Sequence, residues 1–133
     1  MNLYALRLSP GDDLRLALSD LVDKNGLEAG CVITAVGSLS QAALRFAEQT
    51  ETTVLTRPFE ILSLSGTLSV HGLHLHMAIA DGEGQTLGGH MMTGCLIRTT
   101  AEIVIGDLDQ FVFRRVLDTQ TGYRELNIDQ FSS

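Results

Sequence analysis

The sequence predicts an α+β domain in which a largely antiparallel, twisted sheet is flanked by one or two helices. The chain has 133 residues, the usual size of a single domain, with only two prolines and no linker-like stretch. One segment near the N-terminus has the apolar spacing of a helix. Most of the remaining chain has strand patterns separated by turn signals, as in hairpins. We therefore treat residues 1–133 as one predicted domain.

The first two elements precede the strand-rich part. Residues 2–8 alternate with period two, which predicts a strand. A helix is expected to follow, because Ser9 is a suitable N-cap, Pro10 suits the first turn and Asp12 completes an S-x-x-D pattern. Gly26 is expected to end this helix. Its apolar stripe, which we expect to cover one face of the sheet, consists of Leu14, Leu18, Leu21 and Val22.

The rest of the chain predicts a succession of strands. Gly37 and Ser38 predict a turn or bulge between the first two, and an interruption is expected near Ser65 and Gly66. Residues 48–53 are expected to form a turn or loop, with or without a short edge strand, and residues 81–84 a hairpin turn. The predicted strands are residues 31–36, 41–47, 59–68, 73–80, 95–105, 110–117 and 123–128.

The charge balance bears on the partners. Nine basic residues against 16 acidic ones give a net charge of −7, and Lys24 is the single lysine. Binding to nucleic acids or anionic membranes relies on clustered Lys and Arg, and Arg114–Arg115 is too small a cluster. Direct DNA binding is therefore disfavoured. Neither a signal peptide nor an apolar run that could span a bilayer is found, so we expect a cytoplasmic protein.

The strand pattern of residues 73–80 predicts a candidate metal site. Side chains alternate between the two faces of a strand, so His74 and His76 share a face with Ala78, opposite the apolar residues. Their Cα atoms are then about 6.5–7 Å apart. Two imidazoles at this spacing can converge on one ion, and the small Ala78 leaves room beside them.

A third histidine completes the candidate site. The turn at residues 81–84 brings the chain back, and Gly88 and Gly89 predict a shaped loop that places His90 beside the first two histidines. Three histidines with one open position are typical of a catalytic zinc site. The alternative interpretation is a solvated polar face, because most histidines are not ligands. His71 is expected to be an exposed turn residue.

Other polar residues have two interpretations each. Glu60 is a candidate general base, or a hydrogen-bond partner of a histidine; alternatively it is a carboxylate at a strand edge or interface. Arg98 is a candidate anion clamp for a substrate, or it forms an ion pair with Glu102. We predict that Arg114 and Arg115 lie in a solvated strand.

Several groups of residues together resemble the PPC domain (plants and prokaryotes conserved, also PCC). The resemblance covers nearly the whole chain. In plants this domain accompanies AT-hooks, basic elements that this chain lacks, whereas in prokaryotes it stands alone. The resembling residues are Phe-Glu-Ile-Leu-Ser-Leu-Ser-Gly at 59–66, His-Leu-His at 74–76, Gly-Gly-His at 88–90 with Gly94, and Arg-Thr-Thr-Ala-Glu at 98–102.

The resemblance implies a homotrimer and a metal held by His74, His76 and His90. It also implies a fold related to that of acetolactate decarboxylase, a zinc lyase. Two hypotheses follow. The first is an oligomeric binding module of unknown partner, with DNA-associated regulation as one role, that carries a Zn²⁺ or other divalent metal site. The second is a small zinc-dependent lyase or hydrolase acting on a small polar or carboxylate-bearing substrate, with Glu60 as its proton shuttle.

Overall fold

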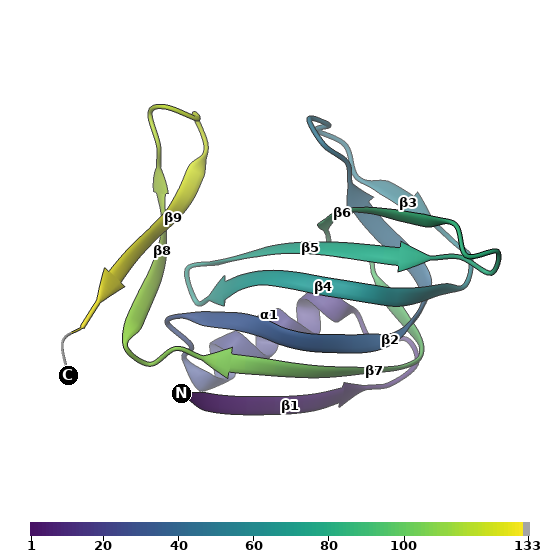
Figure 1. The fold of residues 1–133 in the computed structure, drawn as a ribbon, viewed down its shortest axis with the longest axis horizontal. Helices are drawn as coiled ribbons and strands as arrows, with labels where there is room; N and C mark the ends of the chain where they lie inside the picture. Colours follow the sequence, from purple (N-terminus) through teal and green to yellow (C-terminus); the bar gives the residue numbers. More distant parts are fainter. Residues whose placement is uncertain (132–133) are drawn as a thin grey trace.

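The computed structural model describes residues 1–131, and every strand pairing in it is antiparallel (Figure 1). This confirms the α+β, mainly antiparallel prediction, with one helix among the described residues. The elements are β1 (Asn2–Leu8), α1 (Leu14–Asn25), β2 (Gly30–Arg45), β3 (Thr53–Leu55), β4 (Phe59–Ser69), β5 (Gly72–Ala80), β6 (Thr86–Met91), β7 (Leu96–Asp107), β8 (Phe111–Leu117) and β9 (Arg124–Gln130).

The large sheet has the order β1-β7-β2-β4-β5-β6, and β3 pairs with β2. The far end of β2 also pairs with β6, where Arg45 lies opposite His90. The strands β2, β4, β5 and β6 therefore form a closed ring. Register shifts along β2 bend this 16-residue strand, which lets its two ends pair with different neighbours. The strands β8 and β9 form a separate two-stranded sheet beside the large one (Figure 1).

The helix begins later than predicted. Its N-cap is Asp13, whose side chain accepts a hydrogen bond from the Leu16 N–H at 3.1 Å. Ser9 and Asp12 instead close a turn before the helix, because the Asp12 carboxylate accepts from the Ser9 N–H. The prediction of Ser9 as the N-cap was therefore wrong, because Ser and Asp are both favoured at this position and the S-x-x-D pattern pointed to the earlier residue. Gly26 ends the helix in a left-handed conformation (φ 59°), which confirms that prediction.

The helix covers one face of the large sheet, as expected (Figure 1). Its side chains Leu14 and Leu18 are fully buried in the same core cluster as Leu75 and Ile79 of β5. Burying each such side chain contributes about 1.5–3 kcal/mol. Since α1 takes the inner face of the sheet, the opposite, outer face remains available for polar side chains.

The turn or bulge predicted at Gly37–Ser38 is a register shift inside a continuous strand, whereas the interruption expected near Gly66 is absent. Residues 31–36 and 41–47 belong largely to the single strand β2, in which Gly37 pairs with Ile61 on one side and Ala101 on the other. Gly66 pairs with Leu75 inside β4. Glycine is needed at Gly37 because a Cβ atom there would lie 2.4 Å from a neighbouring carbonyl oxygen. These glycines therefore permit close strand pairing and do not end strands.

Within residues 1–131, α1 is the only helix. At 12 residues it falls short of the length needed to cross a membrane.

Candidate metal centre

The alternation predicted for residues 73–80 is present in β5. Leu75, Met77 and Ile79 are buried in the core, whereas His74 and His76 are exposed on the outer face. Across the strand pair, His74 lies opposite Thr67 and His76 opposite Ser65, both in β4. The two histidines are therefore held by a strand that is paired on both sides and anchored by its buried face.

His90 lies in a strand, which corrects the prediction of a shaped loop. The hairpin turn after β5 is as predicted, and it sets a register in which His90 of β6 lies directly opposite His76. A Cβ atom at Gly88 would lie 2.7 Å from the Met77 carbonyl oxygen, and one at Gly89 would lie 2.8 Å from that of Arg45. The two glycines are thus required by tight packing of strands. The prediction that His90 lies beside the other two histidines is confirmed, because β6 pairs with β5 in this register.

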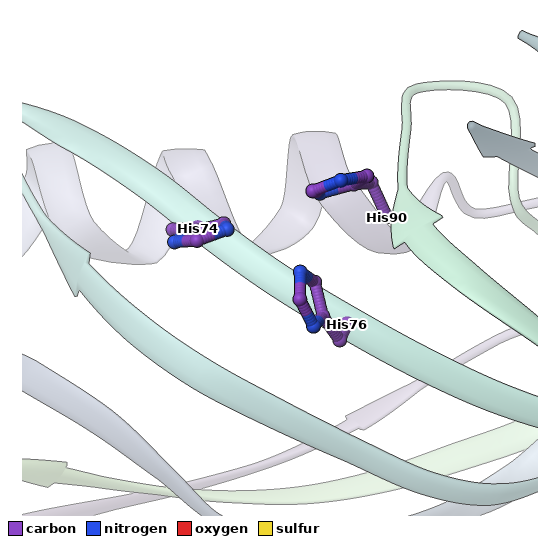
Figure 2. A group of neighbouring side chains, drawn as sticks. All are labelled: His74, His76 and His90. Carbon is purple, nitrogen blue, oxygen red and sulfur yellow. The ribbon is translucent and has the colours of Figure 1, made fainter. Parts of the chain in front are cut away.

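The three imidazoles gather over one stretch of β5 (Figure 2). Ring centroids are 5.0 Å apart for His74–His76, 4.6 Å for His76–His90 and 5.8 Å for His74–His90. One nitrogen of each residue lies within 4.8 Å of those of the other two. Two nitrogens bound to one zinc at about 2.0–2.1 Å are at most about 4.1 Å apart, so small side-chain rotations suffice. The donor set therefore fits a divalent metal such as Zn²⁺.

The electrostatics favour the neutral form of His74 and His90. Burial lowers the pKa of His74 from its ordinary value, and Arg115 and His76 lower it further. Burial likewise lowers the pKa of His90, with Arg45 as the next cause. Neutral imidazole is the form that binds metals, because the nitrogen lone pair must be free. Both shifts thus favour metal binding near neutral pH.

The other predicted site residues lie elsewhere. Glu60 pairs with Ala80, four residues along β5 from His76, which corresponds to about 13 Å on the same outer face. Arg98 lies on β7, three strands away from β5 in the sheet order. The structure therefore brings neither side chain to the histidines. His71 forms an ion pair with Glu28 at 2.9 Å and stays outside the cluster.

One residue at the site was missed. Arg115 of β8 donates a hydrogen bond from Nη2 to Oγ1 of Thr67 at 3.0 Å, beside His74. The interpretation of a solvated strand holds for Arg114, which is exposed and paired with Asp129, but it is wrong for the half-buried Arg115. The alternation of β8 carried the missing signal, since Arg115 shares a face with the buried Phe113.

Arg115, His74 and His76 line one open pocket with a volume of about 250 Å³. Its walls come from both sheets of the molecule. The lining side chains are Ser65, Thr67, His74, His76, Arg115 and Leu126.

The family whose sequence model matches residues 1–109 is the Plants and Prokaryotes Conserved (PCC) domain. The chain belongs to the PCC domain family. A curated relative, the bifunctional protein GlmU of Synechococcus sp. (strain JA-3-3Ab), is 52% identical over 130 residues. That match covers 98% of this PCC domain and 21% of the relative. The chain thus spans about a fifth of the length of the curated relatives it matches.

Solved structures share the fold of this PCC domain. A hypothetical protein from Salmonella cholerae-suis is 47% identical, with a TM-score of 0.95 and coverage of 97% of this chain and 94% of the other. The metal-containing protein AF0104 from Archaeoglobus fulgidus is 26% identical, with a TM-score of 0.77 and coverage of 96% and 94%. A protein from Bacteroides thetaiotaomicron proposed to bind DNA is 21% identical, with a TM-score of 0.85 and coverage of 95% and 91%, and shows the fold alone.

The residues of the candidate site lie partly inside and partly outside the region that the PCC family model matches. The three histidines and the β4 residues lie within residues 1–109, whereas Arg115 and Leu126 lie beyond the matched region. The three histidines therefore belong to the part of the chain that the family model matches, and Arg115 comes from the β8–β9 hairpin that follows it.

Proposed function

We propose that this PCC domain is an oligomeric binding module that holds Zn²⁺ or another divalent metal with His74, His76 and His90. The observation that carries the proposal is the convergence of three imidazole nitrogens within 4.8 Å on an exposed face. The metal content of the A. fulgidus relative supports it. Three ligands from one short hairpin need little ordering to bind, because β5 and β6 already hold them in register.

A second candidate function is a small zinc-dependent lyase or hydrolase that acts on a small polar or carboxylate-bearing substrate. The open pocket beside the cluster favours it, since a catalytic site needs room for a substrate. When bound, the metal would supply Lewis acidity. Against catalysis stands the position of Glu60, about 13 Å along β5 from His76, because a general base must lie within hydrogen-bond reach of its proton. We therefore favour the binding module.

Metal analysis of the purified protein tests the metal proposal. We expect a divalent metal at close to one equivalent per chain after purification without chelators. After chelation, added zinc should raise the melting temperature, because a ligand that binds only the folded state stabilises it. A protein that purifies without metal and melts at the same temperature with and without zinc would contradict the proposal.

We further propose that the domain assembles as a homotrimer through the outer face of β1, β7 and β2. This face carries exposed Leu3, Ile33 and Val36 with 60%, 48% and 52% of their surface accessible. The side chains of Met1 and Ile33 both lie over Gly106, which has no side chain of its own, so apolar atoms of these two residues approach each other there. Contiguous apolar surface of this kind is typical of interfaces between proteins. A second and third copy of the chain are the proposed occupants.

Sedimentation equilibrium tests this assembly. We expect a mass of three times the 14.4 kDa chain, and a lower mass for Ile33→Asp, which places a charge in the apolar patch. The matched control Val54→Asp changes an exposed apolar residue on β3 and should leave the mass unchanged. A wild-type monomer at micromolar concentration would refute the trimer.

Direct DNA binding is not part of the proposal. The net charge is −7, and Arg45 and Arg115 both act on the pKa of His74 at the metal site. Two arginines on a protein of this net charge are too few to form a basic patch for duplex DNA. Any association with DNA would depend on a partner protein.

A further inference from the structure

We infer that Arg115 makes the histidine cluster into a binding site for a small anion, and that its guanidinium binds a carboxylate or phosphate group of the ligand. The inference rests on the proposed metal site, for which it names the class of ligand. The same pocket would then hold the metal on one side and the anionic group of the ligand on the other.

The position of Arg115 is fixed by contacts to β4 and β5. Its Nη2 donates to Oγ1 of Thr67 at 3.0 Å. Its aliphatic stem runs over Gly72, where a Cβ atom would come within 3.2 Å of the Arg115 Cγ. Within residues 1–131 the guanidinium forms no ion pair, so most of its five N–H donors are free for a ligand. An arginine held in this way is positioned to form bidentate hydrogen bonds with an anion.

The charges around the pocket favour an anion. None of the lining residues is acidic. Among the described residues, Arg57 and Arg114 form ion pairs with Asp81 and Asp129, whereas Arg115 forms none. A positive pocket on a protein of net charge −7 concentrates small anions locally.

The size and the other donors of the pocket indicate a small ligand. Its volume of about 250 Å³ is below the usual range for drug-sized molecules. The hydroxyl groups of Ser65 and Thr67 line it beside Arg115, and Leu126 adds one apolar contact. The anion clamp that the sequence suggested at Arg98 is therefore assigned to Arg115, which lies at the histidines.

Titration with inorganic phosphate and, separately, with malonate tests the inference. Amide NMR spectra of the wild type and of Arg115→Gln are recorded with and without zinc. We expect at least one anion to bind the wild type, with shifts at residues around His74 and Thr67, and the Kd to rise about tenfold or more in Arg115→Gln. Tighter binding of phosphate or of malonate identifies a phosphate or a carboxylate ligand.

Arg114→Gln is the matched control, because Arg114 lies next to Arg115 on β8 but points into an exposed ion pair with Asp129. Its Kd for the anion should stay within about twofold of the wild-type value. Thr67→Val is a second test that retains the charge and removes the hydrogen bond to Arg115. It should weaken anion binding by a smaller factor than Arg115→Gln does.

Zinc affinity separates this inference from the proposed function. Arg115→Gln should still bind zinc at one equivalent per chain, since Arg115 is not a ligand. Failure of all variants to bind zinc would remove the proposed metal site, whereas the titration without zinc would still report on Arg115. Equal anion affinity in the Arg115→Gln and Arg114→Gln proteins, or no binding of either anion by the wild type, would overturn the inference.

Discussion

Replacing His76 by alanine is expected to weaken zinc binding on the order of 100-fold or more, because it leaves only two imidazole ligands. His76 is the central member of the cluster, with ring centroids 5.0 Å from His74 and 4.6 Å from His90. Its side chain lies on the outer face, so the core should remain intact. The zinc affinity is measured by competition with a chromophoric chelator, and the zinc-dependent rise in melting temperature should disappear.

His71→Ala is the control for this substitution. His71 is the fourth histidine of the chain and pairs with Glu28, away from the cluster. Its removal should leave the zinc affinity unchanged, and both variants should sediment with the same mass as the wild type. Wild-type zinc affinity in the His76→Ala protein would show that the three histidines do not form the metal site.

Gly66→Ala is expected to lower the free energy of unfolding by about 3 kcal/mol. Gly66 has a φ of 147°, and a Cβ atom there would lie only 2.0 Å from the carbonyl oxygen of His74. The strands β4 and β5 must therefore separate locally, which also displaces His74. Urea unfolding of the metal-free protein measures the loss of stability, and chelator competition should show weaker zinc binding in the same variant.

Gly82→Ala is the matched control, because it lies in the turn after β5 and no atom lies within 4 Å of the added Cβ. Its stability should differ from that of the wild type by less than about 0.5 kcal/mol. Should Gly66→Ala be as stable as Gly82→Ala, the tight pairing of β4 with β5 at the site would be disproved.

The parts of the fold that depend on local patterns were predictable. Alternation along β5 predicted which face carries His74 and His76, because a strand with one buried face must alternate. The hairpin turn after it was equally clear. The start of the helix was not, since Ser9 and Asp13 are both suitable N-caps and only the surrounding chain decides between them.

The parts that depend on distant pairing were harder to predict. Nothing local indicates that β2 pairs with β7 and β4 and, at its far end, with β6, so Gly37 and Gly66 suggested interruptions. For the same reason Arg115 was predicted to be solvated, because its hydrogen-bond partner Thr67 lies 48 residues earlier in the chain. Glu60 and Arg98 were chosen for their chemistry alone, and the sheet order places them away from the histidines.

The candidate site combines side chains from two different sheets, the large sheet and the two-stranded sheet of β8 and β9. The three histidines come from a single hairpin of the large sheet, whereas Arg115 comes from the separate β8–β9 hairpin. Under the proposed function, changes in the short β8–β9 hairpin would alter ligand selectivity while the hairpin that carries the three histidines stays constant.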